Sequence, residues 1–197
     1  MESQEITLKL KCSVDEFCNV LENKEFKVSL KFLLDDTYFI SQKLDIKKLS
    51  VREILKEAVL LRNIDDYYIN KKSYKLTFKK KEFDKNGNIL NQSSVNCKIF
   101  DLEEGRNFLE NIGYKEILNI KESDIVYQKD DLKIAIKDIE NGDKLIEVET
   151  VENNIEFNTI EKLKEKILQM KLPIYEEDFF VKKAEVELEK KLKINDI

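Results

Sequence analysis

Four stretches of the chain alternate strictly between apolar and polar residues, as a β-strand does when its two faces have different surroundings. These stretches are residues 5–11, 74–79, 132–137 and 144–150. In each of them the polar positions carry charged or hydroxyl side chains. The pattern predicts strands whose polar side chains face one another across a shared lumen.

The strand predicted over residues 144–150 carries two carboxylates on one face. Because successive side chains point to opposite faces, Glu147 and Glu149 share one face, while Ile146 and Val148 share the other. The usual rise of a strand places the two glutamates about 7 Å apart. They are the first candidates for a charged site.

Three capping boxes predict where helices begin. In each, a serine or aspartate is followed three residues later by a glutamate, so that side chains satisfy the first backbone N–H groups. The pairs are Ser13 with Glu16, Ser50 with Glu53, and Asp101 with Glu104. A fourth helix is expected to begin within residues 158–161 and to end at Pro173. A last helix is indicated by Val181, Ala184, Leu188 and Leu192.

Polar turns are predicted between the remaining extended segments. Residues 26–40 are expected to be extended with a turn at residues 35–36, and a strand over residues 59–64 is expected to end at residues 65–66. The Asn-Gly sequence within residues 84–88 favours a hairpin turn, because both turn residues tolerate a positive φ. Further strands are expected over residues 73–80, 94–100 and 115–123.

These elements together predict an α+β fold, in which helices pack outside a closed or nearly closed antiparallel β-barrel. The apolar stripes of the helices need an apolar sheet face to cover. With the helices outside, the polar strand faces would converge inside a barrel or line a concave sheet. The alternative is a sheet with one face in water, which gives the same alternation in any single strand.

Length and composition are those of a globular chain. The 197 residues suit a single domain, and 42% apolar residues in regular patterns argue against disorder. A net charge of −5 argues against duplex nucleic acid as a partner, because such binders are normally basic. Three cysteines without metal-ligand spacing indicate free thiols, and no apolar run reaches the length of a membrane span. We expect a cytoplasmic protein that binds neither nucleic acid nor membrane.

The chain contains no histidine and only four glycines. The absence of histidine excludes Ser-His-Asp and Cys-His nucleophile systems, as well as histidine-based zinc sites. The glycine-rich loops that cradle phosphates are absent from the sequence too. Any chemistry must come from carboxylates, lysines, arginines or a metal ion.

A lumen formed by the polar strand faces would hold acids and bases together. The acids are Glu5, Glu147 and Glu149, and the bases are Lys9, Arg62, Lys79 and Lys121. Clustered carboxylates favour a hard divalent cation such as Mg²⁺ or Mn²⁺, and clustered bases repel one another unless an anion lies among them. A polyphosphate with bound metal meets both demands, although any one of these lysines taken alone is more simply a solvated surface residue.

Six short motifs follow one another along the chain in an order found in a known family. Residues 5–9 resemble an opening Glu-x-Glu-x-Lys motif, residues 36–39 match Asp-Thr-Tyr-Phe, and residues 59–62 resemble Ala-Leu-Arg-Ile-Arg. Residues 76–79 resemble Leu-Thr-Leu-Lys, residues 121–123 resemble Lys-x-Arg, and residues 147–149 match a closing Glu-x-Glu. The chain thus resembles the CYTH superfamily, the triphosphate tunnel metalloenzymes.

This resemblance implies an eight-stranded antiparallel tunnel over about residues 4–150, followed by helices over about residues 158–193, all in one domain. It also implies roles for the charged residues. Glu5, Glu147 and Glu149 would bind divalent metal, and Lys9, Arg62, Lys79 and Lys121 would hold a triphosphate. The family includes class IV adenylyl cyclases, thiamine triphosphatases and inorganic triphosphatases. No general base is identifiable, so no catalytic residue is assigned.

Several charged positions depart from the family pattern. Thr7 replaces the second glutamate of the opening motif, Ser123 replaces an arginine, and Lys137 stands where the family has an aspartate. Ser94, Asn96 and Lys98 stand where the family has Arg-x-Glu-x-Glu. Loss of a charged hydrogen-bond partner costs on the order of 1.5–3 kcal/mol per contact, so these changes would weaken activity or alter the ligand.

Three hypotheses follow for the function. The first is a metal-dependent enzyme that hydrolyses a triphosphate, with cyclisation of ATP as its alternative. The second is a catalytically degenerate tunnel that binds a nucleotide or polyphosphate. The third is a structural module whose charged face is simply wet. Pairing of two chains through the Lys- and Glu-rich last helix is a further possibility, although a solvated helix explains that composition equally.

Overall fold

The computed structural model describes residues 5–83, 89–151 and 154–195. The strands are β1 (Glu5–Lys9), β2 (Lys27–Ser41), β3 (Val59–Asp66), β4 (Lys71–Phe83), β5 (Ile89–Ile99), β6 (Tyr114–Lys129), β7 (Leu132–Ile139) and β8 (Lys144–Glu149). The helices are α1 (Val14–Asn23), α2 (Val51–Leu55), α3 (Leu102–Asn111), α4 (Ile160–Gln169) and α5 (Lys183–Asn195), with a 3₁₀ turn at Ile46–Lys48. No helix in the described chain is both long and apolar enough to cross a membrane.

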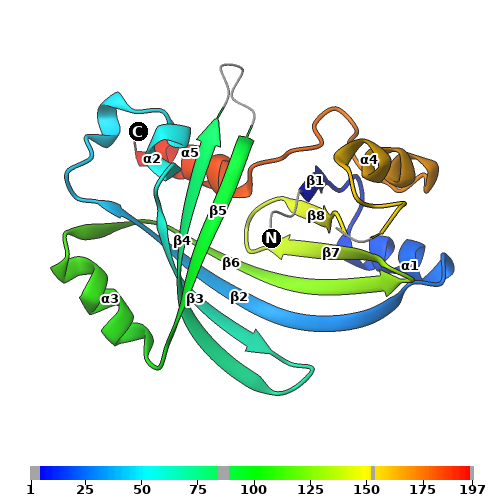
Figure 1. Ribbon diagram of the computed structural model, residues 1–197, viewed down its shortest axis with the longest axis horizontal. Helices are drawn as coiled ribbons and strands as arrows, with labels where there is room; N and C mark the ends of the chain where they lie inside the picture. Colours follow the sequence, from blue (N-terminus) through cyan, green and yellow to red (C-terminus); the bar gives the residue numbers. More distant parts are fainter. Residues whose placement is uncertain (1–4, 84–88, 152–153, 196–197) are drawn as a thin grey trace. The chain divides into compact units, whose positions relative to one another are not determined.

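The eight strands form one antiparallel sheet in the order β1-β8-β7-β6-β2-β3-β4-β5 (Figure 1). This arrangement of strands with helices outside confirms the predicted fold class. Because β1 and β5 stand at the two ends of the order, the sheet is not strictly closed, which is consistent with a nearly closed barrel.

The described chain divides into two compact units, each assembled from three separate segments. Unit 1 comprises Met1–Phe32, Asp66–Tyr68 and Glu122–Lys182, and unit 2 comprises Leu33–Asp65, Ile69–Lys121 and Lys183–Ile197. The long strands β2 and β6 contribute residues to both units. The boundaries of the predicted single domain stay a prediction.

The core of unit 1 lies between its strands and the apolar stripes of α1 and α4. Strand residues such as Ile6, Ile136 and Val148 are fully buried there, together with Phe17 of α1 and Leu163 of α4. Figure 1 shows α4 running beside β1 and β8. The alternation in β1 and β8 therefore places their apolar positions against the helices, as predicted.

The core of unit 2 centres on Phe39, Leu61 and Leu109. Helix α3 packs closely here because it has a glycine at its contact with the sheet. A Cβ added at Gly105 would come within 2.7 Å of Ile99 Cδ1 and 2.9 Å of Leu61 Cδ1. This close approach explains why a helix interior tolerates the weakest helix former besides proline.

The three predicted helix starts are confirmed. Reciprocal capping boxes join Ser13 to Glu16 and Ser50 to Glu53, and the Asp101 side chain accepts a hydrogen bond from the Glu104 amide. Helix α3 is followed by Gly113, whose φ of +85° is the left-handed conformation common just after a helix.

The outer edge of β1 is covered by the segment that follows α4. The Thr7 amide donates to the Phe179 carbonyl at 3.0 Å, and the Val181 amide donates to the Thr7 carbonyl at 3.0 Å. The Tyr175 amide donates to the Lys9 carbonyl at 2.9 Å. Because edge strands with unpaired backbone groups invite pairing with other chains, this segment protects β1.

One predicted break between strands is wrong and another is confirmed. Residues 35–36 lie inside the continuous strand β2, whereas β3 ends at Asp66, within the predicted break. The physical reason at the first position is that the aspartates have partners on neighbouring strands, since Arg62 donates to Asp36 and Asn119 donates to Asp35. The predicted hairpin turn at residues 84–88 lies outside the described residues.

Candidate functional site

Three carboxylates of unit 1 come together where β1 pairs with β8. Glu5 lies directly opposite Glu149 in the antiparallel register, and Thr7 lies opposite Glu147. One oxygen from each of Glu5, Glu147 and Glu149 lies within 4.8 Å of the other two. The structure thus gathers all three predicted metal ligands, which we call the glutamate trio.

The glutamate trio has the chemistry of a site for a hard cation. Like charges that face each other across two strands destabilise the sheet. Carboxylate oxygens in a cluster of this size are the ligands that Mg²⁺ and Mn²⁺ prefer. Glu5 and Glu149 are exposed and Glu147 is half-buried, so an ion could reach the trio from solvent. The donor set therefore fits a divalent metal ion.

Lys9, the predicted phosphate ligand of unit 1, lies two residues beyond Thr7 on β1. Its Nζ forms an ion pair with Asp143 Oδ1 at 2.7 Å, and its side chain is 46% exposed. An exposed pair of this kind contributes at most about 1 kcal/mol, so it can be exchanged for another anion at little cost.

Lys137 of β7 is the buried cation of unit 1. Its Nζ lies 3.0 Å from Asp124, 3.5 Å from Glu147 and 3.7 Å from Glu122. Its side chain is only 9% exposed, and those of Glu122 and Asp124 are 1% exposed. Since Glu147 also belongs to the glutamate trio, one carboxylate links the buried lysine to the candidate metal site.

The charge of Lys137 is fixed by its neighbours. Burial alone would lower the pKa of its ammonium group, but Glu147, Asp124 and Glu122 oppose that effect and raise the pKa above its ordinary value. The group therefore stays protonated at neutral pH. Lys137 and its partners form a permanent ion cluster.

The burial of this cluster differs from that of the predicted lumen residues of unit 1. Glu122, Asp124 and Lys137 are 3%, 1% and 7% exposed, so these three side chains do not lie on a face in water. Glu5, Lys9 and Glu149 are exposed, however, and the wet-face alternative stays open for them. The prediction that polar faces from the whole sheet line one shared lumen stays a prediction.

Arg62 of β3, another predicted phosphate ligand, forms an ion pair within unit 2. Its Nε donates to Asp36 Oδ1 and its Nη2 donates to Asp36 Oδ2, both at 2.5 Å. The Asp36 side chain is 1% exposed and that of Arg62 is 18% exposed. This fork-to-fork geometry holds the guanidinium in one orientation.

Lys121 of β6 lies near a second carboxylate of unit 2. Its Nζ is 4.0 Å from Asp35 Oδ2, and its side chain is 55% exposed. Asn119, two residues earlier, donates to Asp35 Oδ1 at 2.7 Å and to Thr37 Oγ1 at 3.0 Å. The residues from the Asp-Thr-Tyr-Phe motif thus bind side chains on both neighbouring strands.

The remaining predicted ligand, Lys79, lies on β4 opposite Ser94 of β5. The side chain of Lys79 lies outside the described side chains. Ser94, Asn96 and Lys98, which replace charged family positions, are exposed on β5. Asn96 has a local role, because its Oδ1 accepts a hydrogen bond from Thr77 Oγ1 at 2.8 Å.

Sequence reasoning missed the role of four of the residues described above. Lys137 was noted only as a departure from a family pattern, Asp36 was assigned to a turn and a motif without its arginine partner, and Glu122 and Asp124 were given no role. The sequence contains only a weak signal that Asp124 and Lys137 are partners. They lie opposite each other because of the register in which β6 pairs with β7. Register depends on turn geometry and packing as well as on the residues themselves.

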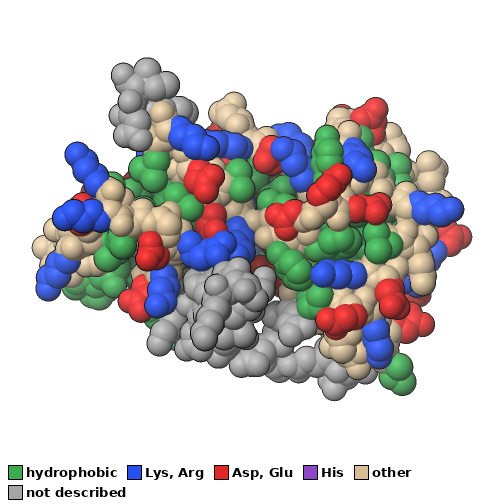
Figure 2. Space-filling model, turned by 90° about the horizontal axis from the view of Figure 1, so that it is seen from above, with side chains coloured by type: hydrophobic (Ala, Val, Ile, Leu, Met, Phe, Trp, Pro, Cys, Tyr) green, Lys and Arg blue, Asp and Glu red, His purple; other side chains and the backbone are tan. Residues whose placement is uncertain are grey.

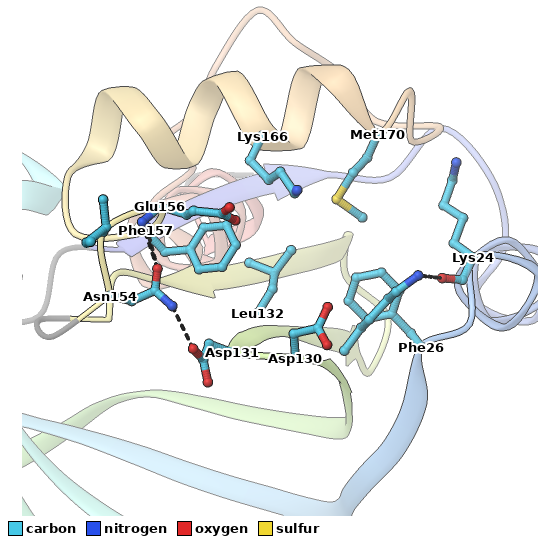
Figure 3. A pocket seen from close by; sticks show the side chains of 12 residues that line it. Lys24, Phe26, Asp130, Asp131, Leu132, Asn154, Glu156, Phe157, Lys166 and Met170 are labelled. Carbon is cyan, nitrogen blue, oxygen red and sulfur yellow. Dashed lines mark hydrogen bonds between the residues drawn. The ribbon is translucent and has the colours of Figure 1, made fainter.

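A cavity of about 710 Å³ lies elsewhere in unit 1, between α4 and the turn joining β6 to β7 (Figure 3). Its apolar lining includes Phe26, Leu132 and Phe157. Charged groups at its rim bind protein neighbours, since Asn154 Nδ2 donates to Asp131 at 2.7 Å and Lys129 Nζ donates to Glu25 at 2.8 Å. None of the predicted site residues lines it, so we place the candidate site at the glutamate trio.

The surface in Figure 2 carries both signs of charge. Lys and Arg side chains are interspersed with Asp and Glu side chains over the face in view. This mixture matches the alternation of charges along the sequence. The prediction that the chain does not bind nucleic acid stays a prediction.

Comparisons with known proteins support one family. No protein-family model matches the chain. A protein of Methanocaldococcus jannaschii named "Putative adenylate cyclase MJ0240" is 25% identical over 187 residues, which cover 93% of this chain and 98% of that protein. The chain is therefore similar to this relative over nearly its whole length.

Solved structures share the fold at lower identity. The PH1819 protein of Pyrococcus horikoshii OT3 matches with a TM-score of 0.71 and 20% identity, covering 95% of this chain and 99% of that chain. The Hippeastrum protein "Putative adenylyl cyclase HpAC1", for which a dominant triphosphatase activity is stated, matches with a TM-score of 0.58 and 16% identity, covering 91% and 90%. Together with the sequence relative, these folds fit the CYTH superfamily, as the sequence motifs predicted.

Proposed function

We propose, from the premise of a CYTH fold, that this chain binds a triphosphate together with a divalent metal ion and hydrolyses it. The observation that carries the proposal is the glutamate trio, because its three oxygens lie within 4.8 Å of one another on paired strands. The named relatives support the substrate class but not a particular reaction, since an adenylate cyclase and a triphosphatase both act on triphosphates.

Glu5, Glu147 and Glu149 would hold the metal ion, which we propose to be Mg²⁺ or Mn²⁺. When bound, such an ion neutralises charge on phosphate oxygens and orients them. The protein's part is to fix the position of the carboxylates. The pairing of Glu5 with Glu149 across β1 and β8 does this through the backbone, because both strands are hydrogen-bonded along their length.

The phosphate groups would be bound by the predicted bases Lys9, Arg62, Lys79 and Lys121. Lys9 is close in sequence to the trio, and its exposed pair with Asp143 can be exchanged for a phosphate oxygen. Arg62 is oriented by Asp36, so that it can offer a guanidinium without losing side-chain entropy on binding. In hydrolysis a water oxygen bonds to the terminal phosphorus, the bridging P–O bond breaks, and orthophosphate leaves.

A second candidate function is a catalytically inactive protein that binds a nucleotide or polyphosphate. A specific observation favours it, because Thr7 removes one carboxylate from the opening motif and Lys137 brings a positive charge to 3.5 Å from Glu147. Both changes lower the negative charge available to a metal. Cyclisation of ATP is the alternative reaction, in which the ribose hydroxyl attacks the innermost phosphorus and diphosphate leaves.

The experiment that tests these alternatives is a substrate panel with a ligand-site variant. Tripolyphosphate, thiamine triphosphate and ATP are each incubated with Mg²⁺, Mn²⁺ or EDTA, and orthophosphate, diphosphate and cyclic AMP are measured. We expect orthophosphate release that needs metal and falls on the order of 100-fold in Glu149→Gln. The matched control is Glu165→Gln on α4, an exposed glutamate of the same unit, which should keep full activity.

The other outcomes separate the hypotheses. Release of diphosphate with cyclic AMP would replace hydrolysis by cyclisation. Thermal stabilisation by a triphosphate without any product would favour the inactive binder, because a ligand of the native state at 100 times its Kd adds about 2.7 kcal/mol of stability. Turnover that is equal in EDTA, or equal in Glu149→Gln, would overturn the metal-dependent proposal.

A further inference from the structure

Two aromatic side chains of unit 1 stay partly in water on the segment that covers the outer edge of β1. We call this segment, residues 171–182, the strap. Its Tyr175 and Phe180 are each 44% exposed. Exposed rings are apolar surface that folding has left in water, and a ligand with an aromatic group would bury them favourably.

The pairing of the strap with β1 places the Phe180 ring on the polar face of that strand. Thr7 and Phe180 form a parallel β-bridge, and residues paired in this way point to the same face of a sheet. Thr7 shares this face with Glu5 and lies opposite Glu147 of β8. The preceding strap residue, Phe179, packs against the apolar core on the other face. Phe180 therefore lies in one row with Thr7 and Glu147, at about 4.8 Å per strand.

Tyr175 reaches the same face further along β1. Leu10 and Ile174 form an antiparallel bridge, and both side chains are buried on the apolar face. Tyr175 follows Ile174 and so points to the polar face, and its amide donates to the Lys9 carbonyl at 2.9 Å. The strap thus presents one ring beside Thr7 and another beside Lys9, a predicted phosphate ligand.

Both rings are held in place by neighbours within unit 1. Lys11 Nζ lies 5.3 Å from the centre of the Tyr175 ring, and Lys164 Nζ lies 4.6 Å from the centre of the Phe180 ring. The Phe180 amide also donates to Asp178 Oδ1 at 2.8 Å. A ring that is already positioned loses little freedom when a ligand stacks on it, and the two lysines add positive charge beside it.

We propose that Tyr175 and Phe180 bind the organic ring of the substrate, so that this chain selects triphosphates that carry a heteroaromatic ring over inorganic triphosphate. The inference rests on the proposed function and specifies the substrate class of that site. The phosphates would lie at the glutamate trio and Lys9, and the ring would stack on the strap. Nucleotides and thiamine phosphates share this chemistry, because both join a planar ring to the phosphates through a short linker.

Stacking separates ring-bearing ligands from ring-free ones. Loss of one stacked aromatic side chain typically weakens binding by a factor of roughly 5 to 150. A ring-free ligand makes no such contact, so its affinity reports only the metal and phosphate contacts. A comparison of the two kinds of ligand therefore isolates the contribution of the strap.

The test compares the binding of ADP, thiamine diphosphate and inorganic diphosphate to the full-length chain, by isothermal titration calorimetry in MnCl₂. These ligands are what remains when the terminal phosphate of each triphosphate is hydrolysed, so they occupy the same site without turnover. We expect the natural protein to bind at least one ring-bearing ligand about 10-fold more tightly than inorganic diphosphate. The tighter of the two identifies the ring.

The variants remove or keep the rings. Phe180→Leu and Tyr175→Leu should each lose about 5-fold or more in affinity for the preferred ring-bearing ligand, while inorganic diphosphate stays within about twofold. Phe180→Tyr and Tyr175→Phe keep a ring and should keep the preference. Phe108→Leu and Tyr68→Leu are matched controls, because these rings are 56% exposed outside the strap. They should change no affinity.

The binding of inorganic diphosphate keeps the test valid if a variant is destabilised, because an unchanged affinity shows that the site is folded. Equal affinities for all three ligands in the natural protein would overturn the inference and leave the proposed metal-dependent hydrolysis intact. So would Phe180→Leu and Tyr175→Leu variants with lowered melting temperatures and unchanged affinities, since the rings would then only attach the strap.

Failure of the proposed function gives a different pattern. Glu149→Gln should weaken all three ligands together, because it removes a metal ligand that they share. A ring preference that the strap variants abolish, but that is unchanged in EDTA and in Glu149→Gln, would overturn the metal dependence and keep the ring site. No binding of any of the three ligands would overturn both proposals.

Discussion

In unit 2 Arg62 and Lys121 each lie beside one aspartate, whereas in unit 1 the buried Lys137 is shared by three carboxylates. Arg62 binds Asp36 through two hydrogen bonds, and Lys121 lies near Asp35. Lys137, by contrast, is shared by three carboxylates, one of which also belongs to the glutamate trio. The glutamate trio of unit 1 has the clustered carboxylate oxygens that a divalent cation prefers. We therefore expect bound metal to stabilise unit 1 in particular.

The largest expected effect on stability is at Lys137 and its three carboxylate partners. Lys137→Met removes the shared cation and leaves Glu122 and Asp124 buried, so we expect a loss of about 3–5 kcal/mol of unfolding free energy in EDTA. Urea unfolding followed by circular dichroism measures it. Lys133→Met, an exposed lysine on the same strand, should change stability by less than about 0.5 kcal/mol. Equal effects of the two variants would show that Lys137 is not a structural cation.

A smaller effect on stability is expected for the Arg62–Asp36 pair of unit 2. Asp36→Asn removes the charge that faces Arg62, and because the Arg62 side chain is 18% exposed, water can partly replace the lost bonds. We expect a loss of about 1.5–3 kcal/mol in the same urea assay. The neighbouring variant Asp35→Asn is the control, and it should lose less than about 1 kcal/mol because its pair with Lys121 is long and exposed.

The capping boxes should respond alike in both units, since they hold no buried charge. Ser13→Ala at α1 and Ser50→Ala at α2 each remove the side chain that accepts from the N3 amide. Each should lower the unfolding free energy by about 1 kcal/mol, independently of added Mn²⁺. A loss in one unit that Mn²⁺ reverses would contradict the idea that metal acts only through the glutamate trio.

The smallest effect concerns acid pH. The hydrogen bonds from the Ser13 backbone and hydroxyl lower the pKa of Glu16 in the folded chain. A carboxyl with a lowered folded pKa adds stability above its unfolded pKa, and this addition is lost as the pH falls through the folded value. The natural protein and Glu16→Gln should therefore differ in melting temperature at pH 7. This difference should disappear below about pH 4. A difference that grows on acidification would reverse the assigned direction.

Local signals in the sequence predicted much of the fold. The serine and aspartate caps gave the starts of α1, α2 and α3, because a cap and its partner lie within four residues of each other. Strand β7 was predicted with its start at Leu132, since alternation over a few residues defines it. The glutamate trio was predicted as well, because both the shared-lumen hypothesis and the resemblance to a family placed Glu5 beside Glu147 and Glu149.

The unpredicted features depend on partners that are distant along the chain. Asp35 and Asp36 look like a turn when they are read alone, but Asn119 and Arg62 stabilise them within β2. Lys137 looks like a substitution on a polar face until the register of β6 with β7 places it opposite Asp124. In both cases the deciding contact is set by strand pairing, which short-range patterns do not encode.

The backbone bonds that cover both edges of β1 have a consequence for biosynthesis. A ribosome makes this strand well before its partners, which are β8 and the segment around Phe179. At typical elongation speeds, roughly 10 to 30 seconds pass before those partners exist. During that time Ile6 and Leu8 cannot be enclosed by their final neighbours, so the newborn chain leaves an apolar segment accessible to chaperones.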